Sequence, residues 1–225
     1  MAEAATTKAD PAASAADSPV RRENRDGIAI LTLQKPATRN SLSSATMSVL
    51  QEMLAACAGD PAVRVIVLAH EGPAFSAGHD LREVSGLIAA RDTDAQHALL
   101  TQCSTLMQQV QKITKPVIAE IAGVATAAGC QLAAACDLVA AGRSARFGTP
   151  GVNIGLFCST PMVALSRAVA SPKHAMEMLL TGELVDAEHA FRIGLVNRVV
   201  DDAGLRDATL ALAAQIASKS QATIA

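Results

Sequence analysis

The segment Phe75–Leu81, with the sequence FSAGHDL, is the first part of the chain whose residue types could do chemistry. It follows the β-branched run of residues 63–69, which is typical of a strand buried on both faces. A small residue and a glycine at a strand-to-helix turn leave backbone N–H groups open to a ligand. We therefore predict a ligand-binding turn here, and an ordinary loop is the alternative.

A second segment, Ile121–Leu132, has the sequence IAGVATAAGCQL. An expected strand runs through Gly123 into small residues at the start of an expected helix. Close backbone approach and the positive end of a helix dipole both suit an anion that develops during a reaction. Tight packing of a helix on a sheet through small side chains would give the same pattern, so the segment alone leaves both interpretations open.

Alternating strand and helix patterns must position these two segments. The apolar runs predict strands over residues 28–33, 63–69, 117–121, 137–141 and 195–200, with a hairpin turn at 24–27. Periodicity and caps predict helices over residues 44–57, 125–135, 172–182, 186–192 and 203–218. Because parallel strands need helical crossovers, the predicted class is α/β. A doubly wound sheet and a solenoid of ββα turns both fit, although no internal repeat supports a regular solenoid.

Composition limits the function classes. The chain has 225 residues, enough for one domain with a sizeable core, and 50% of them are hydrophobic. A net charge of -2 and the absence of Trp and Tyr argue against nucleic-acid binding. The five histidines have no metal-ligand spacing, so we expect no metal. No apolar run is long enough to span a bilayer.

Cysteine usage and the N-terminal segment bear on location. The five cysteines include no CxxC pair, which favours a reducing compartment. Residues 1–19 are rich in alanine, lack an apolar stretch, and contain acidic residues but no arginine. We interpret them as a disordered tail and not as a secretory or mitochondrial signal, and we expect a cytoplasmic protein. The expected core spans residues 20–200, and residues 201–225 begin a C-terminal helical region.

Four blocks of the sequence resemble the crotonase (enoyl-CoA hydratase/isomerase) superfamily. They are Asn40–Leu42, Phe75–Leu81, Gly123–Asp137 and the stretch from Thr181 to Val200. The run Thr149–Pro161 is similar to that of the subgroup called enoyl-CoA hydratase domain-containing protein 3. The resemblance implies a ClpP-like ββα spiral that forms homotrimers or hexamers. It also implies an acyl-CoA substrate in fatty-acid metabolism, with coenzyme A as part of the substrate and no tightly bound cofactor.

The resemblance also implies roles for particular residues. Two backbone N–H groups, by position those of Ala77 and Ala128, would stabilise an enolate-like oxyanion of the thioester. Coenzyme A would lie along the loop that contains Thr38, Arg39 and Asn40, where the arginine could reach a phosphate. The residues that would hold its pantetheine and adenine end are Ala77, Gly78, His79, Asp80 and Leu81.

The family pattern is broken at the two glutamates with which hydratases of this superfamily hold and activate water. Gln131 stands at the first position and Gly151 at the second. A glutamine amide can bind water but cannot act as a general base, and glycine supplies no group at all. Losing a positioned base typically costs about 10²–10⁴ in rate. Cys158 and His79 are the candidate substitutes, as a nucleophile or a proton carrier.

Three hypotheses follow. The first is an enzyme of the enoyl-CoA hydratase/isomerase family, the second a non-catalytic acyl-CoA-binding protein, and the third another thioester reaction such as hydrolysis. Family members usually continue for about 40 residues beyond Ala225, so we expect the C-terminal helical region to be truncated here.

Overall fold

The computed structural model describes residues 18–224, and a six-stranded sheet forms its centre. The strands, in spatial order, are β1 (Val20–Arg25), β2 (Ile28–Leu33), β3 (Val65–His70), β5 (Val117–Ile121), β7 (Leu138–Gly142) and β10 (Arg198–Val200). Only the β1–β2 hairpin of this sheet is antiparallel. Strands β2 and β5 are buried along their whole length, which explains their continuous apolar sequence.

A second, four-stranded sheet consists of β4 (Ala74–Ser76), β6 (Val124–Thr126), β8 (Arg146–Gly148) and β9 (Val185–Asp186). β4, β6 and β8 each follow a strand of the first sheet, so the chain repeats a ββα turn. Gly123 makes the corner between β5 and β6, where φ is +104° and a Cβ would lie 2.2 Å from the carbonyl oxygen of Pro73. Of the two arrangements that fit the sequence, a doubly wound sheet and a solenoid of ββα turns, the structure therefore has the ββα spiral.

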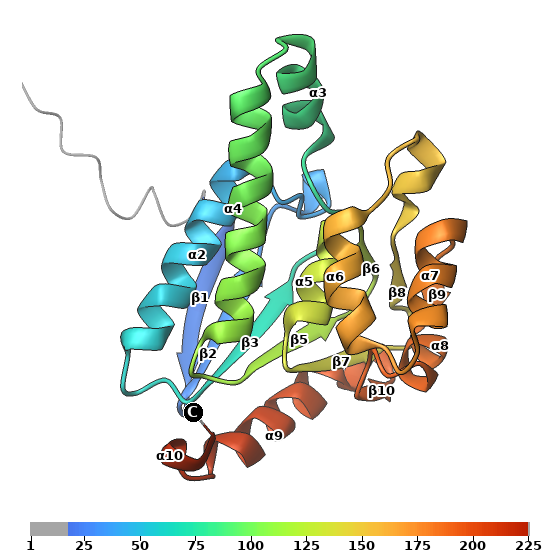
Figure 1. Cartoon of the computed structure of the whole chain (residues 1–225). Coiled ribbons are helices and arrows are strands. Elements are labelled where there is room, and N and C mark those ends of the chain that lie inside the picture. The colour runs from blue at the N-terminus through green and yellow to red at the C-terminus, as the bar shows by residue number, and fades with distance from the viewer. Residues whose placement is uncertain (1–17, 225) are drawn as a thin grey trace, which may run out of the picture.

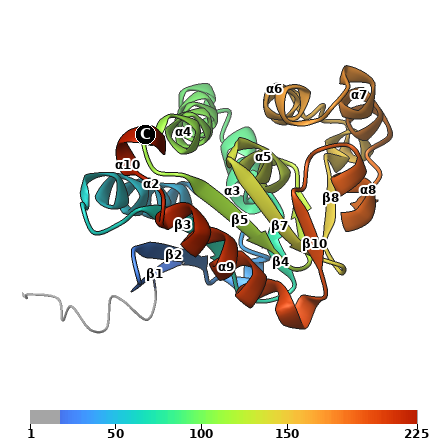
Figure 2. The same ribbon diagram turned by 90° about the horizontal axis from the view of Figure 1, so that it is seen from below.

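Helices cover both faces of the six-stranded sheet. Their bounds are α2 (Ser44–Gly59), α3 (Leu81–Ala89), α4 (Thr93–Lys112), α5 (Ala128–Ala135), α6 (Ser159–Ala168), α7 (Pro172–Thr181), α8 (Ala187–Arg192), α9 (Leu205–Ala217) and α10 (Gln221–Ile224). Short 3₁₀ helices occur at η1 (Pro36–Thr38), η2 (Pro150–Ile154) and η3 (Asp202–Gly204). Figure 1 shows α2, α4 and α5 on one face of the sheet, and Figure 2 shows α9 crossing the other.

Local sequence signals explain where several helices begin and end. Ser43 caps α2, and Ser171 caps α7 with a proline at its first position. Gly182 ends α7 in the left-handed conformation. The helix expected over residues 125–135 begins only at Ala128, because residues 124–126 pair as β6.

The N-terminal boundary also differs from the expectation. Most of the expected tail, residues 1–17, lies outside the described residues. Ser18 and Pro19, however, are not part of a disordered tail. The carbonyl oxygen of Pro19 accepts a 3.0 Å bond from the backbone N–H of Gln34, and that of Ser18 accepts a 2.8 Å bond from the Gln34 side chain. None of the described helices is long and apolar enough to cross a membrane.

Candidate functional site

The two segments selected from the sequence meet at the carboxyl ends of β4 and β6. These strands are parallel neighbours, with Ser76 opposite Ala125. The turns that follow them therefore come together: a Cβ placed on Gly78 would lie 3.1 Å from the backbone nitrogen of Ala128. The register of the second sheet thus joins two segments that lie 50 residues apart in the sequence, counted from 78 to 128.

Only one of the two N–H groups expected to bind the oxyanion is free in the described structure. The Ala77 N–H donates a 3.0 Å bond to the carbonyl oxygen of Arg39, so it is not available to a ligand. Within residues 18–224, no acceptor is found for the N–H of His79 or of Ala128. Ala128 opens α5, and the first N–H groups of a helix have no intrahelical acceptor. The expected Ala77 N–H is thus occupied, and the N–H groups of His79 and Ala128 are the ones in these two turns that could bond a ligand.

Ala127 holds the second turn in an unusual conformation. Its φ is 50° and its ψ is -121°, a region that side-chain-bearing residues rarely adopt and that costs about 1–3 kcal/mol. Its N–H donates to the carbonyl oxygen of Gly148 at 2.9 Å, which ties the turn to β8. This conformation fixes the direction in which the next peptide N–H, that of Ala128, points.

The loop before α2 lies against the first turn, but its three expected ligand-binding residues differ in exposure. Asn40 is 2% exposed, and its side-chain oxygen accepts a 2.8 Å bond from the Lys35 N–H. Its amide donates to the carbonyl oxygens of Glu71 at 2.9 Å and Ala74 at 2.7 Å. Asn40 therefore acts as a clamp within the protein. Thr38 and Arg39 are exposed beside the site.

Of the residues at the start of α3, some are engaged in the fold and others are open to a ligand. Asp80 caps α3, accepting from the N–H groups of Arg82 at 2.9 Å and Glu83 at 3.4 Å, so its carboxylate is engaged in the fold. Leu81 is 58% exposed and remains open to a ligand. Among residues 18–224, neither buried ring nitrogen of His79 has a hydrogen-bond partner in good geometry. Burial lowers the pKa of this imidazole, which keeps it neutral near pH 7, although the Leu42 backbone is close enough to favour the protonated ring slightly.

The two positions where the family pattern breaks face different surroundings. Gln131 is 5% exposed, its Oε1 has no partner, and it lines a pocket of about 370 Å³ between α4 and α6. Gly151 is buried in η2, where an added Cβ would lie 2.3 Å from the Leu156 carbonyl oxygen and 2.7 Å from the Cys158 Sγ. Space at residue 151 is therefore filled, and no side chain fits there without movement of the loop.

The cysteine considered as a nucleophile is in a poor setting for that role. Cys158 is 8% exposed, and burial raises the pKa of its thiol, with partial compensation from a backbone hydrogen bond at Gly151. Burial also raises the pKa of the nearby Cys130 thiol to about 12. A protonated thiol is a weak nucleophile, so the geometry does not favour covalent catalysis by Cys158.

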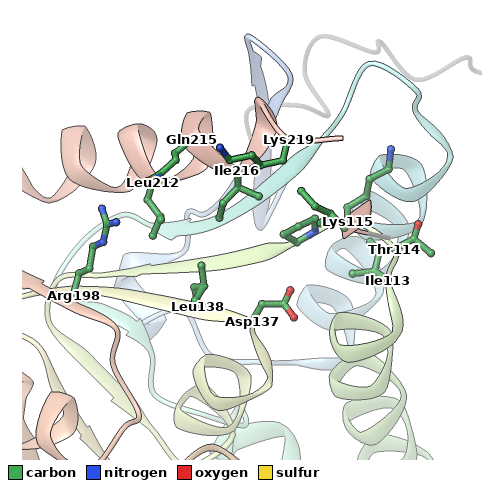
Figure 3. A pocket seen from close by; sticks show the side chains of 12 residues that line it. Ile113, Thr114, Lys115, Asp137, Leu138, Arg198, Leu212, Gln215, Ile216 and Lys219 are labelled. Carbon is green, nitrogen blue, oxygen red and sulfur yellow. The ribbon is translucent and has the colours of Figure 1, made fainter. Parts of the chain in front are cut away.

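A separate pocket of about 630 Å³ lies at the opposite, amino-terminal ends of β5, β7 and β10, under α9 (Figure 3). Its Lys115 donates to the carbonyl oxygens of Asp60 and Val63, at 3.2 and 2.6 Å. The Asp137 carboxylate accepts from the Val117 N–H at 2.8 Å. These charges serve the fold, and the pocket contains no residue of either turn. Within the described chain, no group of three or more His, Cys, Asp or Glu could hold a metal ion.

Known proteins resemble this chain in sequence and in overall structure. The sequence profile described as enoyl-CoA hydratase/isomerase matches residues 23–225. Enoyl-CoA hydratase domain-containing protein 3, mitochondrial, from Danio rerio is 43% identical over 90% of this chain and 68% of its own length. The Homo sapiens protein of that name is 41% identical over 92% of this chain and 67% of its own length. The chain therefore spans about two thirds of the length of these curated relatives.

Solved structures agree with the sequence matches. The crystal structure of human enoyl Coenzyme A hydratase domain-containing protein 3 has a TM-score of 0.87 and 43% identity, covering 92% of this chain and 80% of its own. An enoyl-CoA hydratase from Mycobacterium smegmatis has a TM-score of 0.87 and 45% identity, covering 92% and 79%. These structures confirm the predicted crotonase spiral and the likeness to the domain-containing protein 3 subgroup.

One expectation is overturned by the same comparisons. We expected a cytoplasmic protein, but the Danio rerio and Homo sapiens relatives carry the word mitochondrial in their names. Composition had favoured a reducing compartment, and that criterion does not separate cytoplasm from organelle.

Taken together, the matched profile, the relatives and the spiral with its two meeting turns show that this chain belongs to the enoyl-CoA hydratase/isomerase family.

Proposed function

We propose that this chain acts on acyl-CoA thioesters by holding the thioester oxygen between two backbone N–H groups. The observation that carries the proposal is a pair of N–H groups, those of His79 and Ala128, which have no acceptor among the described residues and lie on either side of the close contact at Gly78. Backbone donors fixed in advance stabilise an enolate-like oxyanion without reorganisation, and one such donor is typically worth about 10²–10³ in rate.

The coenzyme A part of the substrate would lie on the exposed side of the same turn. Thr38, Arg39 and Leu81 are exposed there, and the Arg39 carbonyl oxygen anchors the loop to the Ala77 N–H at 3.0 Å. A guanidinium on such a loop suits a phosphate of coenzyme A. Coenzyme A would thus enter as part of the substrate in fatty-acid metabolism.

Ordinary hydration has little support at this site. Gln131 offers an amide, and Gly151 offers neither a carboxylate nor room for one. The neutral His79 and the protonated Cys158 do not replace a pair of carboxylates. We therefore assign a reaction that needs only the polarised thioester. The same observations support non-catalytic acyl-CoA binding as the second candidate, and thioester hydrolysis as the third.

Binding of two matched ligands tests the oxyanion hole itself. Butyryl-CoA carries the thioester oxygen, whereas S-butyl-CoA, a thioether of the same chain length, lacks it. Two hydrogen bonds worth about 1 kcal/mol each should make butyryl-CoA bind roughly 10- to 30-fold more tightly in calorimetry. Equal affinities would overturn the proposed hole.

Mass spectrometry of crotonyl-CoA after incubation with the protein separates the candidate reactions. We expect no product heavier by one water. Such a product would mean that another group activates water and that our assignment of Gln131 and Gly151 is wrong. Free coenzyme A would move the assignment to hydrolysis. Unchanged ester together with tight butyryl-CoA binding would favour the non-catalytic candidate.

A further inference from the structure

The groove that contains Gln131 has features that the proposed oxyanion hole does not use. Helix α5 lies between α4 and α6 (Figures 1 and 2), and residues of all three helices line the groove. Its polar lining comes from all three helices: Ser104, Gln108, Gln111 and Lys112 on α4, Gln131 on α5, and Thr160 and Arg167 on α6. We call this the α4–α6 groove. Its volume is about 370 Å³, enough for part of a small ligand.

A buried amide without a partner forms the floor of the α4–α6 groove. Gln131 is 5% exposed, and its Oε1 accepts no hydrogen bond within the described residues. A polar atom buried without a partner costs about 1–3 kcal/mol. Only a hydrogen-bond donor could satisfy Oε1 itself, whereas the Nε2 of the same amide can donate to an acceptor in the groove.

The walls of the α4–α6 groove are cationic. On α4, Lys112 donates to Gln108 at 3.0 Å, and Gln108 donates to Ser104 at 3.3 Å, which gives one ordered polar face. On α6, Arg167 is exposed, and no hydrogen bond or ion pair of its guanidinium is found within residues 18–224. None of the side chains found to line the groove carries a carboxylate. An anion is therefore the complementary ligand.

We propose that the α4–α6 groove binds the distal carboxylate of a dicarboxylic acyl-CoA, with Arg167 and Lys112 as the cations and the Nε2 of Gln131 as a hydrogen-bond donor. Gln131 lies three residues after Ala128 on α5, a rise of about 4.5 Å, so a short acyl chain held at the oxyanion hole could reach the groove. This inference rests on the proposed function and adds a substrate class to it.

Calorimetry of the whole chain with two five-carbon thioesters tests the inference. Glutaryl-CoA ends in a carboxylate and pentanoyl-CoA ends in a methyl group, and the two are otherwise alike. We expect glutaryl-CoA to bind roughly threefold to tenfold more tightly, since half-exposed ion pairs are modest in strength. Arg167→Gln and Lys112→Gln should each reduce this preference, and the double variant should abolish it.

Arg25→Gln is the matched control, because it removes one positive charge far from the groove. The Arg25 side chain is 68% exposed in the β1–β2 hairpin, and its ion pair with Asp26 is long, at 3.9 Å. This control should leave the preference unchanged. Tight binding of both thioesters without a preference for glutaryl-CoA would contradict carboxylate binding in the α4–α6 groove. It would still agree with thioester binding at the proposed oxyanion hole. If neither thioester bound better than free coenzyme A, the proposed function and the inference would both be wrong.

Discussion

At the scale of single residues, Gly151 distinguishes this chain from a two-glutamate hydratase. A missing carboxylate alone could be restored by mutation, but residue 151 also lacks space. An added Cβ would overlap the Leu156 carbonyl oxygen at 2.3 Å, and that atom belongs to the backbone. We therefore expect the Gln131→Glu/Gly151→Glu variant to remain without hydratase activity towards crotonyl-CoA and to lose stability. Overpacking of this kind typically costs about 1–3 kcal/mol.

Thermal unfolding and mass spectrometry of the same samples check this prediction. Gly151→Ala separates the steric effect from the charge, and it should be destabilised as well. Ile154→Ala is the control, because that residue belongs to the same η2 turn but is 66% exposed, and alanine brings no charge to this exposed apolar position. It should unfold near the wild-type temperature. Hydration by a stable double variant would show that the loop moves and that only carboxylates were missing.

The sequence alone predicted some residue roles better than others. The absence of glutamate at 131 and 151 could be read directly, whereas the lack of room at 151 depends on how the chain folds back at Leu156. The donor in the first turn was misassigned for a similar reason. Whether the Ala77 N–H is free depends on the carbonyl of Arg39, which lies 38 positions away in the sequence, from 39 to 77.

At the scale of elements, helices were easier to predict than the short strands. Capping serines, Pro172 and Gly182 are local signals, and they gave the bounds of α2 and α7 within about two residues. The strands β4, β6 and β8 have three residues each, too few for periodicity to reveal. Yet these strands bring the two turns together, so the site itself was not predictable from pattern.

The loop before α2 gives a prediction at the same scale, because one side chain holds it in place. Asn40→Ala should lower the free energy of unfolding by about 2–4 kcal/mol, since it removes three buried or half-buried hydrogen bonds, to the Lys35 N–H and to the carbonyl oxygens of Glu71 and Ala74. Asn40→Asp should be no better, because a carboxylate oxygen would face the carbonyls of Glu71 and Ala74. Urea unfolding measures both.

Thr38→Ala is the control for this loop. The Thr38 side chain is exposed and makes one 3.1 Å bond to the Lys35 carbonyl oxygen, so its removal should change the unfolding free energy by less than about 0.5 kcal/mol. An Asn40→Ala protein as stable as the Thr38→Ala protein would contradict the clamp. It would then return Asn40 to the set of candidate ligand-binding residues.

At the scale of the whole molecule, apolar side chains gather on neighbouring exposed elements. Figure 1 shows α6, α7 and α8 on one side of the chain. The large exposed apolar residues of these helices and the loops beside them are Ile154, Leu156, Phe157, Val163, Met176, Leu180, Leu184 and Phe191. Leu180 is 62% exposed and Phe191 is 49% exposed. Large exposed apolar patches mark interaction sites, and on this ground we propose that the chain forms the homotrimers or hexamers that the family resemblance implies.

Light scattering after size-exclusion chromatography should therefore give three or six times the 23.1 kDa mass of one chain. Leu180→Glu combined with Phe191→Glu should shift the protein towards the monomer, because charges in an apolar interface must be desolvated. Leu100→Glu is the matched control: that residue is 50% exposed on α4, outside this apolar side. A wild-type monomer at tens of micromolar would contradict the assembly. Dissociation by the control alone would place the interface on α4 and beside the α4–α6 groove.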